Sequence, residues 1–166
     1  MRIQPLRWLG RAAAGLFGLL VAGVVAWFSG IGPWAVIPGG VLWGEVRDPP
    51  ADWAFTDSIA EVQVQTHVGP LPWSVTTWVL SHQGRLFLAA GECERVWTRR
   101  VKADPEIRVR IDGTIYELRA DHVTDRALGA ALAPVVLHKY MGVAVETGNW
   151  IEGATNGCVF AVSPRR

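Results

Sequence analysis

The segment at residues 106–123, "EIRVRIDGTIYELRADHV", constrains the fold of this chain more than any other part of it. In its first half, isoleucine and valine alternate with Arg108 and Arg110, which predicts a strand with one buried and one solvent-facing side. The Asp-Gly pair at 112–113 follows directly, and this pair is the strongest short-range signal for a two-residue turn. We therefore predict an antiparallel hairpin over this segment.

Further strands are predicted on both sides of this hairpin. Residues 59–66, "IAEVQVQT", alternate between apolar and polar types. Residues 73–90 predict a second hairpin, in which Gln83 and Gly84 form the tight turn. Residues 157–164, "GCVFAVSP", predict a final short strand.

A short helix is predicted between the two hairpins. Residues 93–104 lack alternation and place Trp97 and Val101 four positions apart, so that both side chains share one helical face. Pro105 should end this helix, because the residue before a proline is disfavoured in helical conformation.

A longer helix is predicted over residues 126–142, with Thr124 or Asp125 as its cap and Pro134 kinking or dividing it. The order is then strands, short helix, strands, helix, strand. Because strands and helices do not alternate as in βαβ units, we predict a mainly β fold with helices (α+β), an antiparallel barrel or sandwich.

The amino terminus is a candidate membrane anchor. Residues 12–28 are apolar throughout, and a membrane-spanning helix needs about 17 to 25 such residues. Arg2, Arg7 and Arg11 precede this run and only Arg47 follows it closely, so we expect the rest of the chain to lie outside the cytoplasm, in the periplasm of a bacterium with the anchor in the inner membrane. A cleaved signal peptide is the alternative, although the run is long for one and lacks a convincing cleavage site.

Three regions follow from these features: an anchor at 1–30, a Gly- and Pro-rich linker at 31–50 and a folded domain at 51–166. The net charge of +1 argues against nucleic acid as a partner, since basic residues are offset by acidic ones over most of the chain. Cys93 and Cys158 leave open whether a disulfide forms.

Residues 97–125, "WTRRVKADPEIRVRIDGTIYELRADHVTD", resemble a segment of the deazaflavin-dependent nitroreductase family. That family is part of the split β-barrel group, which includes pyridoxamine 5′-phosphate oxidase. Its members begin a short helix with tryptophan, end it at Asn-Pro or Asp-Pro, and continue with two strands around a glycine turn. The resemblance extends back to residue 59 and implies an antiparallel split β-barrel that dimerises and binds FMN or F420 between its subunits as an oxidoreductase.

The resemblance also implies where the cofactor's phosphates are held. The family places a basic, hydroxyl-bearing run ahead of its second strand, but here that run, "THVGPLPWSVTTW", contains no arginine or lysine. Hydroxyl groups of this run and cations of the short helix are the remaining phosphate donors, and the tryptophan of the helix is a candidate for stacking on the flavin ring. The candidate cofactor-binding residues are Ser74, Thr76, Thr77, Arg95, Trp97, Arg99, Arg100 and Lys102.

Simpler explanations exist for the same residues. The helix cations lie among acidic residues, which favours a solvated, internally compensated charged face over an anion site, and a core position is favoured for Trp97 over stacking on a flavin. The four histidines show no metal-ligand spacing, so no metal site is expected. Because a flavin carries the hydride chemistry itself, no catalytic residue can be assigned from the sequence. The alternative functions are a cofactor-free binding or assembly module at the membrane, and a barrel that binds haem or another planar ligand.

The predicted topology can be tested with a reporter enzyme that is active only outside the cytoplasm. Fused after Arg166, the reporter should be active, because the positive charges precede the apolar helix. The mature protein should also retain residues 1–30, as measured by mass spectrometry of the purified chain. A shortened product that is released from the membrane would identify the apolar run as a cleaved signal peptide.

Overall fold

The computed structural model describes residues 5–29, 32–34, 37–69, 71–142 and 158–165. Its helices and strands are α1 (Pro5–Phe28), β1 (Glu45–Arg47), the 3-10 helix η1 (Ala54–Ser58), β2 (Glu61–Thr66), β3 (Trp73–His82), β4 (Arg85–Ala90), α2 (Val96–Ala103), β5 (Glu106–Ile111), β6 (Thr114–His122), α3 (Arg126–Met141) and β7 (Cys158–Pro164).

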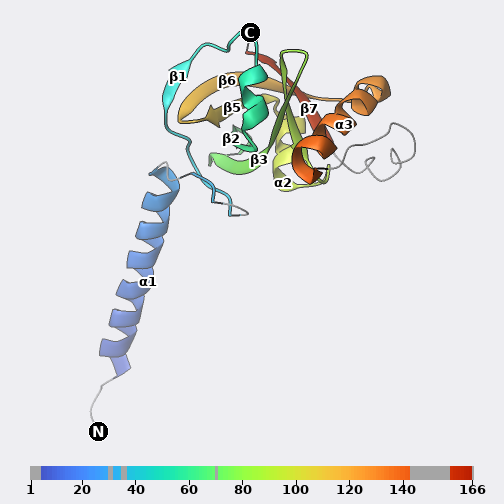
Figure 1. Ribbon diagram of the computed structural model, residues 1–166. Helices are drawn as coiled ribbons and strands as arrows, with labels where there is room; N and C mark the ends of the chain where they lie inside the picture. Colours follow the sequence, from blue (N-terminus) through green and yellow to red (C-terminus); the bar gives the residue numbers. More distant parts are fainter. Residues whose placement is uncertain (1–4, 30–31, 35–36, 70, 143–157, 166) are drawn as a thin grey trace.

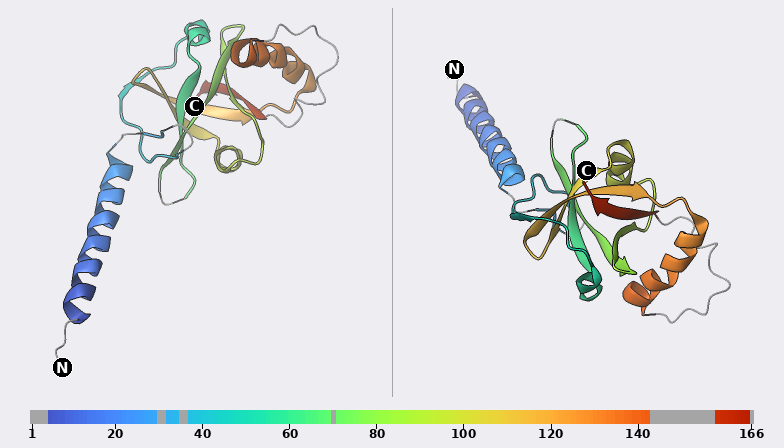
Figure 2. Two further views of the ribbon diagram at one scale, coloured as in Figure 1. Left: turned by 60° about the horizontal axis from the view of Figure 1, so that its bottom comes forward. Right: turned by 90° about the horizontal axis from the view of Figure 1, so that it is seen from above.

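The strands form one sheet in the order β1-β6-β5-β2-β3-β4-β7, and a further pairing between β6 and β7 closes β2 to β7 into a barrel. Every pairing within the barrel is antiparallel, whereas β1 adds to β6 in parallel at the outside. Helix α1 projects away from the barrel, and α3 lies on the opposite side of the domain (Figures 1 and 2). The predicted antiparallel split barrel is confirmed.

Both predicted hairpins are present with the predicted turns. Gln83 and Gly84 join β3 to β4 with φ angles of 53° and 73°. Asp112 and Gly113 join β5 to β6 with φ angles of 47° and 81°. Positive φ at both central residues matches the right-handed twist of the flanking strands, which explains why these residue pairs select tight hairpins.

Apolar side chains fill the barrel interior. The side chains of β2, β3 and β5 that alternate inward include Val64, Val79 and Val109, each with no exposed surface. Helix α2 covers one part of this core through Trp97, whose ring lies 5.5 Å from the ring of Phe160 on β7. A ligand of ordinary size must therefore bind on the outside of the barrel.

Helix α3 packs against the outer face of β3 and β4. Asp125 caps it by accepting a hydrogen bond from the backbone N–H of Ala127 at 2.9 Å, as predicted. The helix continues through Pro134 instead of dividing there. Near its end, the Tyr140 hydroxyl lies 2.9 Å from the backbone nitrogen of Val79, and burial raises the pKa of Tyr140 to about 12.

Part of the predicted linker, 31–50, packs against the barrel through apolar residues. Its carboxyl half contributes β1, whose three residues are too short to show alternation. Leu42 has no exposed surface, and Gly39 exchanges two backbone hydrogen bonds of 2.8 Å with Ser74 on β3.

A disulfide joins Cys93, in the loop before α2, to Cys158 at the start of β7. The two Cα atoms lie 4.7 Å apart, and the residues are separated by 65 positions in the sequence. The bridge therefore ties the last strand of the barrel to the middle of the chain.

Removing this disulfide should destabilise the domain. The change Cys93→Ser together with Cys158→Ser should lower the free energy of unfolding by about 4 kcal/mol, because the closed loop of 65 residues restricts the unfolded chain. Denaturant unfolding of the detergent-solubilised protein measures this difference. As a control, a reducing agent should lower the unfolding midpoint of the unaltered protein and leave that of the double variant unchanged; an unaltered protein that is insensitive to reduction would contradict the prediction.

Candidate functional site

A polar face lies on the outside of the barrel across β3, β2 and β5. The pairing register places residues of β2 directly beside outward-facing residues of both neighbouring strands. We call this set the outer polar face, and its members are Gln63, Gln65, Ser74, Thr76, Arg108 and Arg110. It combines guanidinium, amide and hydroxyl donors on rigid strands, which is a composition suited to an oxygen-rich anion.

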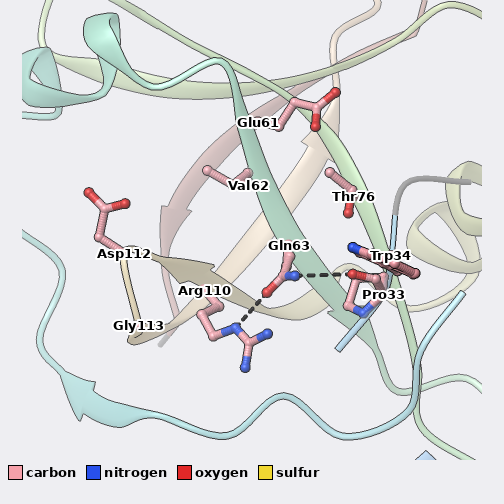
Figure 3. A pocket seen from close by; sticks show the side chains of 9 residues that line it. All are labelled: Pro33, Trp34, Glu61, Val62, Gln63, Thr76, Arg110, Asp112 and Gly113. Carbon is pink, nitrogen blue, oxygen red and sulfur yellow. Dashed lines mark hydrogen bonds between the residues drawn. The ribbon is translucent and has the colours of Figure 1, made fainter. Parts of the chain in front are cut away.

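One half of the outer polar face opens into a cavity of about 320 Å³. Figure 3 shows Gln63 between Arg110 and Pro33 in this cavity, with Thr76 nearby. Arg110 Nε donates to Gln63 Oε1 at 2.5 Å, and Gln63 Nε2 donates to the Pro33 carbonyl at 3.3 Å. These bonds fix the orientation of the guanidinium group. Glu61 also lines the cavity and brings a negative charge into it.

Partial burial affects the charge of Arg110 only slightly. Burial lowers the pKa of the Arg110 guanidinium, but an arginine begins so far above neutrality that the group stays protonated. Arg110 also donates to the Trp43 carbonyl at 3.1 Å. The cation is thus held by the chain segment that follows the anchor.

The other half of the outer polar face is covered by the chain itself. Gly39 lies over Ser74, and a Cβ atom on Gly39 would come within 2.5 Å of backbone atoms of Gly32 and Pro33 and 2.8 Å of Ser74 Oγ, so only glycine fits this close crossing. The backbone N–H of Leu42 donates to Gln65 Oε1 at 2.7 Å. Among the described residues, Ser74 Oγ and Arg108 Nε are buried without a hydrogen-bond partner.

Arg108 Nε has a charged neighbour, although the two groups do not form a hydrogen bond. It lies 3.7 Å from Glu117 Oε1, which is an ion-pair distance but exceeds the range of N–H···O hydrogen bonds. Both side chains retain some exposure, so this pair contributes little to stability.

The cations of α2 do not join the outer polar face. Arg100 turns towards the loop at 67–72: its Nε donates to Thr66 Oγ1 at 2.8 Å, and its terminal nitrogen donates to the Val68 carbonyl. The guanidinium carbon also lies 5.7 Å from the centre of the Trp73 ring. Arg100 therefore fastens the loop between β2 and β3.

The remaining predicted residues are dispersed. Lys102 Nζ lies 3.4 Å from the Cys93 carbonyl and 3.9 Å from Glu94 Oε1, and Arg95 and Arg99 are exposed on the helix. The other two lie inside the fold: Trp97 is 5% exposed in the core, and the Thr77 hydroxyl donates to the Ala89 carbonyl at 2.8 Å.

Of the eight predicted site residues, only Ser74 and Thr76 lie on the outer polar face. Sequence analysis missed Gln63, Arg108 and Arg110 as site residues. The alternation at 106–111 did place both arginines on the outward side of their strand. It could not reveal that β2, more than 40 positions earlier in the chain, pairs beside them.

Three residues with metal-binding side chains also meet, which their spacing in the sequence did not indicate. The ligand atoms of Cys93, His122 and Cys158 all lie within 4.8 Å of one another, with His122 Nε2 3.6 Å from Cys93 Sγ. In this structure the two sulfur atoms are joined to each other. Burial, and to a smaller extent the charge of Lys102, lowers the pKa of His122.

Comparison with solved structures shows the same fold. Conserved hypothetical protein Rv2991 from Mycobacterium tuberculosis matches 72% of this chain and 86% of its own, at 13% identity and a TM-score of 0.53. A putative pyridoxamine 5′-phosphate oxidase from Listeria innocua matches 68% and 90%, at 13% identity and a TM-score of 0.51. Campylobacter jejuni ChuZ matches 67% and 50%, at 11% identity and a TM-score of 0.50.

No family model and no curated protein matches the sequence. The fold is assigned from the likeness to the solved structures alone. It is the split barrel of pyridoxamine 5′-phosphate oxidase-like proteins, as the sequence resemblance implied.

The contrast between two neighbouring arginines of α2 is testable. Arg100→Ala should lower the free energy of unfolding by about 2 to 3 kcal/mol, because it removes charge-assisted hydrogen bonds to Thr66 at the end of β2 and to carbonyls of the loop that follows. Arg99→Ala, the matched control, removes an exposed side chain and should change it by less than about 0.5 kcal/mol. Denaturant unfolding measures both, and equal effects would show that Arg100 does not fasten the loop.

Proposed function

We propose that this protein is a membrane-anchored oxidoreductase of the split-barrel group that uses FMN or F420. The open half of the outer polar face would hold the phosphate group of the cofactor. The observation that most supports this proposal is the cluster of Thr76, Gln63 and Arg110 around one cavity on the outside of the barrel, whose interior is filled with side chains.

The fold supports this proposal through the resemblance to a putative pyridoxamine 5′-phosphate oxidase. The donor set supports it independently, because FMN carries a phosphate monoester and F420 a phosphodiester. Gln63 and the Trp43 carbonyl fix the guanidinium group of Arg110 beside the cavity, and a cation fixed in orientation there favours an anionic group such as phosphate. Ser74 Oγ and Arg108 Nε, buried without hydrogen-bond partners among the described residues, extend the same face.

The acidic residues of the cavity define where an anion would sit. Glu61 and Asp112 line the same space as Arg110 and Thr76. A phosphate would therefore bind over Gln63, which lies between Arg110 and Thr76 in Figure 3, where both donors flank it and the carboxylates of Glu61 and Asp112 lie at the edge of the cavity. The donors of the outer polar face fit a phosphate group better than the dispersed cations of α2 do.

The bound cofactor would supply hydride transfer, and the protein would supply binding and orientation. Arg110 would hold the phosphate, Gln63 would fix the direction of the guanidinium group, and Thr76 would donate a hydroxyl hydrogen bond. We assign no catalytic residue, because no acid or base of the chain is required for the hydride itself.

The proposed location is the inner membrane, with the barrel in the periplasm. Residues 10–28 of α1 have a mean hydropathy of 1.8 and are long enough to cross a bilayer. Arg2 and Arg7 before this segment, and Arg11 at its start, favour a cytoplasmic amino terminus. Pairing of two copies, which the resemblance implies, stays a prediction.

A second candidate function is a cofactor-free binding or assembly module at the membrane. It is favoured by the cover over half of the outer polar face, where Gly39 and Leu42 already use Ser74 and Gln65. In this case the fold would present a surface to another molecule without redox chemistry.

Cofactor retention distinguishes the two functions. The full chain, purified in detergent and incubated with FMN or F420, should retain one of them through gel filtration, as measured by visible absorption. Arg110→Gln should weaken retention roughly 10- to 100-fold through the loss of a charge-assisted phosphate contact. Arg119→Gln is the matched control, because Arg119 pairs with Asp121 and does not line the cavity.

Two results would contradict the oxidoreductase proposal. Retention of neither cofactor by the unaltered protein would favour the cofactor-free module. If Arg110→Gln and Arg119→Gln weaken retention equally, the phosphate does not bind at the outer polar face.

A further inference from the structure

Large apolar side chains lie exposed beside the carboxyl end of α1. They come from two loops, one at residues 32–43 and one at residues 67–72. We call them the juxtamembrane surface, and its members are Trp34 (82% exposed), Ile37 (62%), Trp43 (61%) and Leu71 (53%). Exposed apolar groups that gather in one region of a protein mark an interaction surface.

Hydrogen bonds fix both loops to the end of α1. Trp43 Nε1 donates to the Phe28 carbonyl at 3.0 Å, and Trp27 Nε1 donates to the Pro72 carbonyl at 3.1 Å. The rings of Trp27 and Trp73 lie 5.8 Å apart. In Figures 1 and 2 the chain at 37–43 lies beside the last turn of α1. The juxtamembrane surface therefore lies at the level where α1 ends.

The two loops that carry this surface contain no Asp, Glu, Lys or Arg of their own. No Asp, Glu, Lys or Arg occurs from residue 12 to residue 44, although a membrane-spanning helix needs only about 20 residues and α1 ends at Phe28. The second loop contains one titratable residue, His67, and burial lowers its pKa, so it is neutral at pH 7. Arg100, which borders this loop, is held by backbone carbonyls of the loop.

We propose that the juxtamembrane surface lies in the headgroup interface of the same bilayer that α1 crosses. This inference rests on the proposed membrane anchoring. Tryptophan is enriched at this depth because its ring is apolar and its N–H is polar, and isoleucine and leucine gain from leaving water. Because α1 crosses the bilayer in this arrangement, the bilayer is the partner next to this surface. The two loops contain no charged residue, so their entry into the interface requires no dehydration of a charge.

The proposal fixes how the candidate cavity faces the membrane. Pro33 and Trp34, at the start of the first loop, line the cavity that contains Thr76 and Arg110. With Trp34 in the interface, the cavity opens beside the lipid headgroups. A ligand of the outer polar face would then approach along the membrane surface.

Spin labels on the full chain in lipid nanodiscs test this inference. A nitroxide label is attached at Trp34→Cys or at Ile37→Cys. The measurement compares how often the label collides with oxygen, which is soluble in the membrane, and with a nickel chelate, which is soluble in water; we call the quotient the oxygen-to-nickel ratio. Leu19→Cys on α1, 72% exposed, is the lipid reference. Phe55→Cys, 47% exposed, is the water reference, because it belongs to η1, and the turquoise turn of η1 lies far from α1 in Figures 1 and 2. Cys93 and Cys158 do not react, because they form a disulfide.

We expect the oxygen-to-nickel ratio at positions 34 and 37 to shift from the value at Phe55 towards the value at Leu19. If the ratios at positions 34 and 37 equal the ratio at Phe55 while Leu19 contacts lipid, the inference is wrong but the membrane anchoring by α1 still holds. Water contact at Leu19 would overturn the anchor and the inference together. Protection from both collision partners, with spin–spin broadening, would assign the surface to a second copy of the chain and also overturn the inference.

Discussion

The position of β2 between β3 and β5 is the constraint on which both the core and the candidate site depend. In this register Val64 pairs with Val75 and Val109 on the inside, while Gln63 pairs with Thr76 and Arg110 on the outside. A shift of one residue would turn valines outward and glutamines into the core. Because burial of the valines stabilises only one register, the apolar core also fixes which polar residues meet on the outer face.

Residues 32–34 and 37–43, which follow α1 in the chain, lie against this face. Pro33 contacts Gln63, Gly39 covers Ser74 and Leu42 is buried beside Gln65. A ligand of the outer polar face would therefore use some of the same groups as this part of the chain. The packing of this part of the chain and ligand binding are physically linked in this arrangement, whichever molecule the face accepts.

Local chemistry made much of the fold predictable from sequence. The turns at Gln83-Gly84 and Asp112-Gly113, the cap at Asp125 and the alternation in β5 each act within a few residues. The site was less predictable, since Gln63 and Arg110 are 47 positions apart and meet only through strand pairing. The role of Arg100 depends in the same way on a loop about 30 positions earlier.

Gly39 and Leu42 cover half of the outer polar face, but some polar groups beneath them make no hydrogen bond. Gly39 completes the backbone pairing of β3 and Leu42 satisfies Gln65, yet Ser74 Oγ and Arg108 Nε stay buried without a hydrogen-bond partner among the described residues. A buried hydroxyl without a partner, such as that of Ser74, costs about 1 to 3 kcal/mol, whereas Arg108 Nε keeps its ion pair with Glu117. Arginine Nε can only donate and a hydroxyl can donate, so the partner that both atoms can use is an oxygen acceptor. The covered half of the face thus has the same chemical preference as the open half.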